Sequence, residues 1–291
     1  MAAKAAQCFV ALSWQRVSSP AVYADQMTSL GQEIIAAQPT MASLFNLVNR
    51  ILSETEEARR SGSVDNLQRA LRDAVQRYVE STHSALEKIA GYGAGLLPSP
   101  CTVMTHSSSK TVVGILREAS RTGKSLQAIV TESRPFCEGR ELARNLGQQG
   151  ITTKVVLDAA IAHYVREADI IIVGADRIAE QSFLNKVGTL SLAMAAHEEQ
   201  VPFYVAAETS KLLSAGLAPI GPVLEATEQR QREEWMNVEL VYSLFEEIPN
   251  RWISGVVTEE GIISMNHLAK YFRQFQVSPS LTRRDAAVTH A

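Results

Sequence analysis

Residues 170–177 read IIIVGADR, and this stretch decides the fold of the chain. Its first four residues, Ile170 to Val173, are all apolar, and the first charged side chain after them is Asp176. Short apolar runs without polar alternation are typical of strands in a parallel sheet that is covered on both faces. The stretch therefore predicts a buried strand with a carboxyl group just beyond its end.

Similar runs occur on both sides of this strand. We predict further short strands at residues 102–104, 126–131, 153–157, 203–206 and 255–258. Helical patterns lie between most of them, at residues 110–121, 138–149, 159–167 and 184–198. Because strands and helices alternate, the chain is predicted to belong to the α/β class, with a Rossmann-like, doubly wound parallel sheet.

The residues before this sheet have a helical pattern instead. Apolar residues recur at spacings of three and four over residues 40–60, and a second apolar stripe follows over residues 64–90. Glycines and prolines then cluster between residues 91 and 100, which predicts a helix stop and a domain boundary. We expect three parts: a helical N-terminal domain at residues 1–97, a Rossmann-like ligand-binding domain at 98–277 and a flexible tail at 278–291. Within the second domain, residues 214–233 are expected to form a loop or an excursion.

The composition limits the classes of function. The chain has 291 residues, of which 46% are hydrophobic and 20% are charged, as in an ordinary globular protein. A net charge of -3 provides no basic field for direct nucleic-acid binding, and no apolar run is long enough to cross a membrane. The three cysteines, Cys8, Cys101 and Cys137, are scattered along the chain, which predicts reduced thiols in the cytoplasm and no zinc site. We expect neither a metal nor another cofactor.

Polar side chains follow the predicted strands at the edge where a doubly wound sheet binds its ligands. Asn185 and Lys186 are expected to open the helix at residues 184–198. The run of hydroxyls before Lys110, with free backbone N–H groups at the start of its helix and a cation close by, suits an oxyanion. Neither a GxxxxGK[ST] loop nor a GxGxxG after a strand is present, so the sequence supports neither nucleoside-triphosphate hydrolysis nor dinucleotide binding. The candidate residues of this pocket are His106, Ser107, Ser109, Lys110, Arg134, Asp176, Asn185, Lys186, Glu208 and Lys211.

Each of these signals also has a structural alternative. The serines before Lys110 can cap the helix that follows. Asp176 comes after an apolar strand, where burial raises a carboxyl pKa toward the range useful for proton transfer, but it can also pair with the adjacent arginine. Lys186 can be an ordinary exposed lysine, and Glu208 with Lys211 can be a surface pair. The residue chemistry alone leaves these alternatives open.

Five short runs resemble those of one superfamily, in the same order along the chain. They are MTHSSSK at residues 104–110, TESRP at 131–135, VGADRI at 173–178, NKVGT at 185–189 and AAET at 206–209. The superfamily unites the alpha, beta and delta regulatory subunits of translation initiation factor 2B with ribose-1,5-bisphosphate isomerase and methylthioribose-1-phosphate isomerase. The resemblance covers about residues 40–263 and implies a helical N-terminal domain joined to a Rossmann-like domain that forms dimers.

The resemblance also implies which residues act. In the isomerases a cysteine and an aspartate shuttle the proton between aldose and ketose phosphates, and these positions match Ser107 and Asp176. A serine hydroxyl has a pKa far above the ~8.5 of a thiol, so Ser107 is a poor acid or base without an activating partner. The Arg-Gly-Ala loop that grips a phosphate in the isomerases is absent, and Gln38 before Pro39 stands where the ribose-bisphosphate enzymes have an arginine. These departures weigh against the known isomerisation.

Three functions stay open at this point, and with them the question whether the chain is an enzyme. The first is binding of a phosphorylated sugar or nucleotide with lost or altered isomerase chemistry, because Asp176 and the NKxGT run are retained. The second is an active aldose–ketose isomerase of a pentose phosphate, with Asp176 as base and Ser107 or water relaying the second proton. The third is a regulatory protein-interaction subunit in translation initiation. The expected partners are a phosphorylated small molecule and a second copy of the chain, with Arg134, Asn185, Lys186 and Lys211 as phosphate and hydroxyl contacts.

Overall fold

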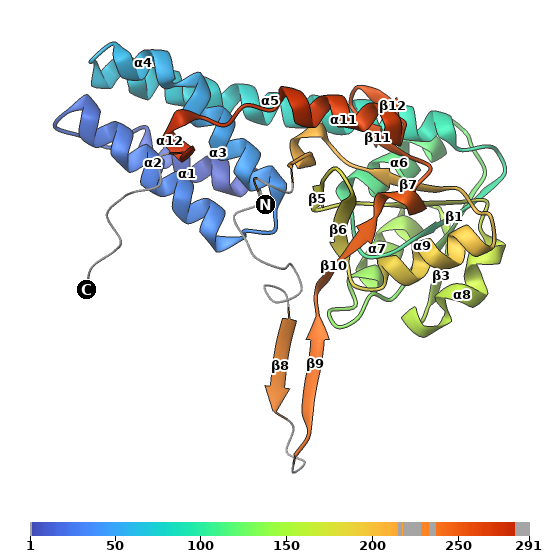
Figure 1. The fold of residues 1–291 in the computed structure, drawn as a ribbon. Coiled ribbons are helices and arrows are strands. Elements are labelled where there is room, and N and C mark those ends of the chain that lie inside the picture. The colour runs from blue at the N-terminus through green and yellow to red at the C-terminus, as the bar shows by residue number, and fades with distance from the viewer. Residues whose placement is uncertain (1, 215–216, 218–227, 233–236, 283–291) are drawn as a thin grey trace. The chain divides into compact units, whose positions relative to one another are not determined.

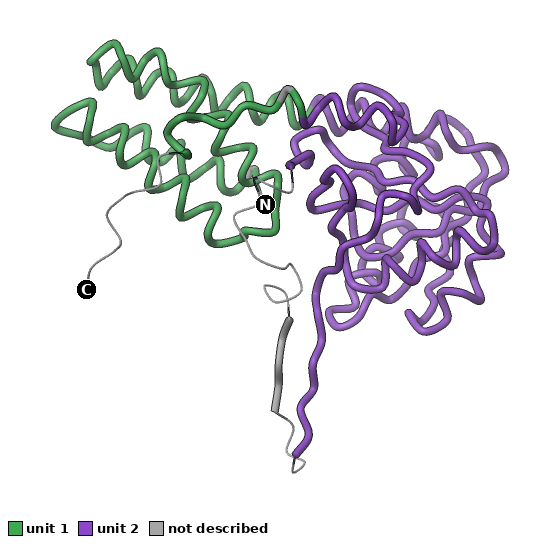
Figure 2. Tube along the Cα trace, in the orientation of Figure 1, with its two compact units in different colours: residues 1–83, 273–291 green, residues 84–272 purple. Residues whose placement is uncertain are grey.

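The computed structural model describes residues 2–214, 217, 228–232 and 237–282. Its contacts divide the chain into two compact units, one formed by residues 1–83 and 273–291 and the other by residues 84–272 (Figure 2). Most of the loop predicted at 214–233 lies outside the described residues, as does the end of the chain after residue 282. The domain limits expected at residues 97 and 277 stay predictions.

The first unit is helical, as the sequence predicts. Leu44, Leu47, Val48 and Ile51 are buried on one face of α3, in agreement with their spacing. The helix predicted over residues 40–60 is divided at Thr55, whose hydroxyl donates to the Ile51 carbonyl oxygen at 2.8 Å. The helices of this unit are α1 (Ala2–Leu12), α2 (Pro20–Ala37), α3 (Ala42–Glu54), α4 (Glu56–Arg60), the first part of α5 (Val64–Leu96) and α12 (Pro279–Thr282) (Figure 1).

The residues that follow α11 (Met265–Gln274) also belong to the first unit. Asn49 of α3 binds them twice, since its Nδ2 donates to Gln276 O at 2.9 Å and its Oδ1 accepts the Ser278 N–H at 2.7 Å. Arg59 Nη1 donates to Ser280 Oγ at 2.7 Å. Residues 278–282 therefore pack on helices of this unit, although their polar composition predicts the start of a loose tail.

The second unit is built on a seven-stranded sheet with the order β12-β11-β7-β4-β1-β2-β3. All neighbouring strands pair in parallel except β11 and β12. This arrangement confirms the predicted Rossmann-like sheet, and the strand order reverses between β1 and β4. The strands are β1 (Cys101–Thr105), β2 (Leu126–Thr131), β3 (Thr152–Val156), β4 (Ile170–Val173), β7 (Phe203–Ala206), β11 (Gly255–Thr258) and β12 (Gly261–Ile263).

Alternate residues of the strands enter two separate hydrophobic cores. Ile171 and Val173 of β4 share one core with residues of α8 (Ile161–Tyr164) and α9 (Thr189–Glu198). Ile170 and Ile172 share the other core with α6 (Lys110–Arg121), α7 (Glu138–Gln148) and the end of α5. Helices therefore cover both faces of the sheet (Figure 1), which is the physical reason that β4 carries no polar residue.

Residues 184–186 do not open a helix, so this part of the prediction is wrong. They end strand β6 (Ser182–Lys186), which lies between β5 (Arg177–Ile178) and β10 (Phe245–Pro249) in an antiparallel sheet. Helix α9 begins only at Thr189, after Gly188, whose φ of +103° favours glycine. Because β10 lies far along the chain from β6, the local sequence pattern cannot reveal this pairing.

Helix α5 continues through the glycines that predict its end. It passes Gly91, Gly93 and Gly95 and ends at Leu96. A Cβ atom on Gly93 would lie 2.4 Å from Ile115 Cδ1 of α6. Glycine at this position lets α5 and α6 approach each other closely, and the end of α5 at Leu96 lies within the stop predicted between residues 91 and 100.

Three smaller features complete the described chain. The helix predicted at residues 159–167 consists of three short pieces, η1 (Asp158–Ala160), α8 and η2 (Val165–Glu167). Strands β8 (Glu228–Arg232) and β9 (Glu239–Ser243) form an antiparallel pair. Among the described helices, none combines the length and the apolar character that a bilayer crossing needs.

Candidate functional site

The carboxyl ends of β7, β4, β1 and β2 lie next to one another at one edge of the sheet. A polar residue follows each of these strands within three positions, at the edge where a doubly wound sheet binds its ligands. Glu132 and Ser133 follow β2, and Asp176 follows β4. His106 and Ser107 come directly after β1. The strand order thus brings to one edge side chains that are far apart in the sequence.

Ser107 is the centre of a hydrogen-bonded cluster. Its backbone has a φ of +63°, and its N–H donates to Ser133 Oγ at 2.8 Å. The Ser107 hydroxyl donates to Glu138 Oε1 at 2.9 Å. Lys186 Nζ lies 2.8 Å from the same carboxylate oxygen. A hydroxyl, a carboxylate and an ammonium group therefore meet in direct contact, and three separate elements supply them.

Lys186 holds its charge in a nearly closed environment. Only 5% of its side chain is exposed, whereas the Glu138 side chain is 25% exposed. The rings of Phe136 and Phe245 lie 4.9 Å and 6.0 Å from Lys186 Nζ, within the range of a cation–π interaction. The alternative of an ordinary exposed lysine is therefore wrong. The pairing of β6 with β10, which the sequence does not reveal, puts Lys186 at this edge.

Asp176 follows β4, and its N–H donates to Leu184 O at 2.9 Å, which holds the chain after β4 against β6. Burial raises the pKa of the Asp176 carboxyl above its ordinary value, and the positive charges of Lys211 and Lys186 offset part of that rise. Lys211 Nζ donates to the Ala175 carbonyl oxygen. Lys186 thus interacts with the charge of Asp176 and forms an ion pair with Glu138, so it links the acid after β4 to Ser107 after β1.

His106 is buried, and both of its ring nitrogens are engaged. Nε2 lies 2.8 Å from Val187 O, an acceptor only, so this nitrogen carries the proton. Nδ1 then accepts from the Thr131 hydroxyl at 2.6 Å. Burial lowers the pKa of His106, which keeps the ring neutral. These bonds give His106 a role in holding β1, β2 and the start of α9 together, and its predicted ligand contact stays a prediction.

Ser109 and Lys110 stand at the start of α6. The Ser109 side chain does not cap the helix, contrary to the structural alternative, and its Oγ lies 2.7 Å from Thr111 Oγ1. A Cβ on Gly174 would lie 2.6 Å from Ser109 Oγ, so glycine after β4 makes room for this side chain. Lys110 is exposed. The first turn of α6 therefore keeps its N–H groups free of a side-chain cap, beside a cation.

The start of α9 is arranged differently, because a carboxylate from another strand occupies it. Glu246 Oε1 of β10 accepts the N–H groups of Gly188 and Leu190, both at 2.8 Å. Asn185 is buried, and its Nδ2 donates to Thr189 Oγ1 at 3.1 Å. Asn185 therefore braces the turn between β6 and α9.

Arg134 is ion-paired rather than free. Glu132, with 5% of its side chain exposed, accepts from Arg134 Nε at 2.9 Å and from Arg140 Nη2 at 2.6 Å. The hydrogen bonds from Arg140 and Arg134 lower the pKa of Glu132. The N–H groups of Ser133 and Arg134 donate to the Asp158 carboxylate at 2.8 Å and 2.6 Å. These contacts fix the turn that leads to Glu138.

Glu208 and Lys211 do not form the side-chain pair that the sequence allows. Ser210 Oγ donates to Glu208 Oε2 at 3.1 Å, while Lys211 is directed to the Ala175 carbonyl oxygen. The sequence pattern does not single out Glu138, because an acidic residue at a helix start is ordinary. The signal that points to Glu138 is its position, since it follows β2 at the carboxyl edge of the parallel sheet.

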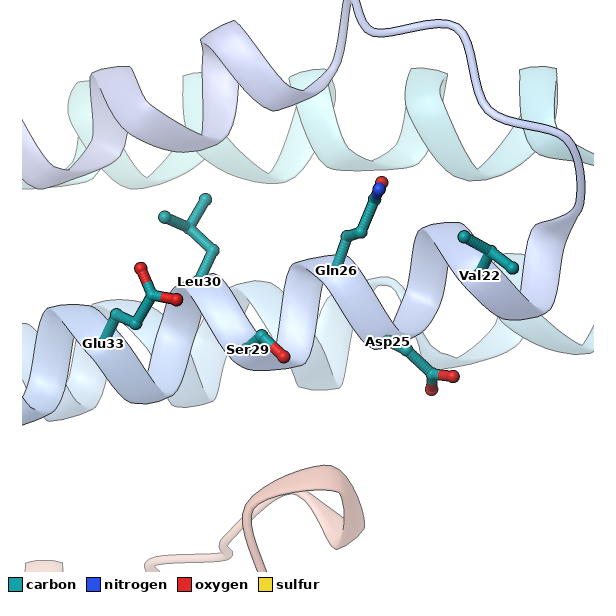
Figure 3. Close-up of a pocket in the computed structure, with 6 residues that line it drawn as sticks. All are labelled: Val22, Asp25, Gln26, Ser29, Leu30 and Glu33. Carbon is teal, nitrogen blue, oxygen red and sulfur yellow. The ribbon is translucent and has the colours of Figure 1, made fainter.

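A hollow in the helical unit fits an anionic ligand poorly. A hollow along α2 is lined by Val22, Asp25, Gln26, Ser29, Leu30 and Glu33, and its charged side chains are acidic (Figure 3). Among the described residues, no group of three or more His, Cys, Asp or Glu side chains is arranged to hold a metal ion. The cysteines Cys8, Cys101 and Cys137 are free thiols.

Comparisons with known proteins identify relatives of this chain. Residues 6–265 match the sequence model of the Initiation factor 2 subunit family, so the likeness begins well before residue 40. The chain is similar to an eIF-2B subunit 2-like protein of Pyrococcus horikoshii, with 34% identity over 267 residues that cover 90% of this chain and 89% of that protein. It is also similar to ribose 1,5-bisphosphate isomerase of Methanocaldococcus jannaschii, with 29% identity over 248 residues that cover 83% and 78%. The crystal structure of the translation initiation factor eIF-2B of Pyrococcus horikoshii matches with a TM-score of 0.78 and 34% identity, and covers 90% of each chain.

Proposed function

Because this chain belongs to the Initiation factor 2 subunit family, as its five sequence motifs predict, we propose that it binds a phosphorylated sugar or nucleotide at the carboxyl edge of its parallel sheet. The observation that carries the proposal is Lys186, a buried cation that pairs with Glu138 and acts on the charge of Asp176. Hydroxyl donors, carboxylate acceptors and ammonium groups in one place match the hydroxyls and the phosphate of such a ligand.

The phosphate group is proposed to lie at the start of α6. This helix begins without a side-chain cap, and Lys110 is its first residue. Free N–H groups and the positive end of the helix dipole favour an anion there. The sugar hydroxyls are then proposed to face Ser107, Asp176 and Lys211, which lie after the neighbouring strands.

A thermal-shift measurement tests the binding. We expect ribose 1,5-bisphosphate, ribose 1-phosphate, methylthioribose 1-phosphate or AMP to raise the melting temperature, since a ligand at 100 times its dissociation constant adds ~2.7 kcal/mol of stability. Lys211→Met should weaken the effect. The control is Lys154→Met, because Lys154 of β3 forms an exposed ion pair with Glu167 of η2. The absence of a shift with all four compounds would contradict the proposal.

A second candidate is aldose–ketose isomerisation of a pentose phosphate. Asp176 favours it, because burial raises the pKa of its carboxyl toward the range in which an acid can take up and return a proton. Ser107 would serve the second proton transfer. Deuterium at C2 of the substrate should exchange into solvent with the wild type and stay in place with Asp176→Asn. Retention of the label by the wild type, in spite of measurable binding, would reject this candidate.

The third candidate is a subunit of a translation-factor assembly, which the name of the Pyrococcus horikoshii relative suggests. We propose a homodimer through the unit that contains the sheet, located in the cytoplasm, where free thiols such as these stay reduced. Light scattering of the purified chain tests the dimer. Co-purification of an initiation factor, compared between the wild type and Lys211→Met, separates a protein-interaction role from a ligand-binding role.

A further inference from the structure

The two carboxylate oxygens of Glu138 differ in their hydrogen-bond partners. Its Oε1 takes both the Ser107 hydroxyl, at 2.9 Å, and the Lys186 ammonium group, at 2.8 Å. Its Oε2 is buried and has no hydrogen-bond partner among the described residues. Leaving a buried polar atom unpaired costs free energy, so a purely structural ion pair would be expected to use both oxygens. Glu138 therefore keeps acceptor capacity next to the Ser107 hydroxyl.

The backbone around this contact is strained. Five non-glycine residues in the described chain have a positive φ, and three of them surround the contact between Ser107 and Glu138. They are Ser107 itself (φ +63°), Ser133 (φ +63°), whose Oγ accepts the Ser107 N–H, and Cys137 (φ +55°), which directly precedes Glu138. Such conformations persist only where the surrounding structure imposes them, and they gather at functional sites. The strain therefore supports a functional role for this contact.

A serine hydroxyl alone exchanges its proton too reluctantly to act as an acid or a base near neutral pH. A carboxylate in hydrogen-bond contact removes this obstacle, because it can take the hydroxyl proton while the oxygen accepts another. From this geometry we propose that Glu138 is the proton partner of Ser107, and that the two side chains together replace an ionisable thiol. The inference rests on the isomerase candidate of the proposed function.

The protons of the proposed step balance. Asp176 takes the proton from C2 of the sugar as the electrons of the C2–H bond form the C1–C2 double bond and the C1–O4 bond of the furanose ring breaks. The proton on O2 passes to Ser107 Oγ as the hydroxyl proton of Ser107 passes to Glu138 Oε1, and the reverse passage delivers a proton to O4, the oxygen released from the ring. The O2 electrons then form the C2 carbonyl group, and the electrons of the C1–C2 double bond take the proton back from Asp176 to form the new C1–H bond. Each side chain ends in its initial state, and no oxidant, reductant or further reactant is required.

The test compares the wild type and three variants in the isomerisation of the same three sugar-phosphate probes, with ribose 1,5-bisphosphate first. Glu138→Gln should lower kcat about 100-fold or more, the usual range for loss of a general acid–base partner. Its KM should stay within about threefold of the wild type, since ligand contacts remain. Ser107→Cys in the Glu138→Gln background should recover at least about tenfold of the lost kcat, because a thiol needs no carboxylate to release its proton. The control is Glu141→Gln on the same helix, where Glu141 forms an exposed pair with Arg144.

The outcomes separate the inference from the proposed function. A kcat of Glu138→Gln equal to that of the wild type, or a double variant no faster than Glu138→Gln, would overturn the role of Glu138. If the wild type binds a probe but turns none over, ligand binding stands and the proton role of Glu138 is overturned. If the wild type binds none of the probes, both are overturned. Should Glu138→Gln fail to fold, as judged by circular dichroism, Glu138→Asp with and without Ser107→Cys provides the same comparison.

Discussion

Gly139 sets the position of α7, and its replacement by alanine tests how closely this helix must approach the sheet. A Cβ at residue 139 would lie 1.8 Å from the Thr131 carbonyl oxygen and 3.2 Å from the Glu132 carbonyl carbon. Since a carbon–oxygen contact is ordinarily about 3.3 Å or longer, the helix or the strand end must move by about 1.5 Å. The neighbouring Glu138 would move with it and lose the 2.9 Å hydrogen bond from Ser107.

The cost of Gly139→Ala follows from the clash with the backbone. Overpacking of a closely packed site lowers the free energy of unfolding by ~1–3 kcal/mol. A clash with main-chain atoms is expected at the upper end of this range, because the backbone cannot change rotamer as a side chain can. About 3 kcal/mol corresponds to a fall of about 6–12 °C in melting temperature for a unit of this size. We expect that fall in a thermal melt followed by near-ultraviolet circular dichroism.

Gly147 of the same helix provides the matched control. Apart from its chain neighbours and the backbone of its own helix, no atom lies within 4 Å of a Cβ built there. Alanine in an open helical position is favoured over glycine by ~0.5–1 kcal/mol, so Gly147→Ala should raise the melting temperature slightly. The same substitution in one helix is therefore expected to act with opposite signs. If Gly139→Ala melts as high as Gly147→Ala, the close approach of α7 to the end of β2 is refuted.

Three further predictions concern charge. Asp176→Asn should raise the melting temperature near neutral pH, because burial raises the pKa of Asp176 and makes its ionised form costly in the folded state. This gain in stability should vanish as the pH falls below the ordinary carboxyl pKa of about 3.9, and equal melting temperatures near neutral pH would contradict the prediction. Glu132→Gln should lower the melting temperature near neutral pH, because Arg140 and Arg134 lower the pKa of Glu132 in the folded protein. This stabilisation is present above the ordinary carboxyl pKa of about 4.3 and is lost as the pH falls through the pKa of Glu132 in the folded state, so the wild type and the variant should melt at the same temperature in strong acid. Lys211→Met should move the acidic limb of the activity profile to higher pH, since Lys211 is the larger of the two charges that lower the pKa of Asp176, and an unmoved limb would argue against their interaction.

The sequence predicts β4 and β11 of the sheet well because these two strands are fully buried. All four residues from Ile170 to Val173 are apolar, because their side chains point alternately into the two hydrophobic cores on the two faces of the sheet. This requirement is visible in the sequence itself. Polar residues such as Asp176 could likewise be assigned to one edge, because the ends of parallel strands meet there.

The parts that could not be predicted depend on distant partners. Lys186 lies in a strand because β10 pairs with β6. The local sequence of neither strand predicts that the two strands pair. Glu138 reads as an ordinary helix start until the turn after β2 brings it against Ser107. Gly93 reads as a helix breaker, although its lack of a side chain serves the approach of Ile115. In each case a tertiary contact overrides the local propensity.

If the proposed ligand binds at this edge, the carboxylate of Glu246 at the start of α9 would limit how many of its phosphate groups can lie at a helix start. It satisfies the N–H groups of Gly188 and Leu190, and thus acts as a resident counter-anion for that helix. Helix α7 begins with an acidic side chain of its own, Glu138, so α6 is the helix of these three whose first turn stays open to an outside anion. A ligand with one phosphate could place it at the start of α6. A second phosphate would need the positive charge of arginine or lysine side chains around the site.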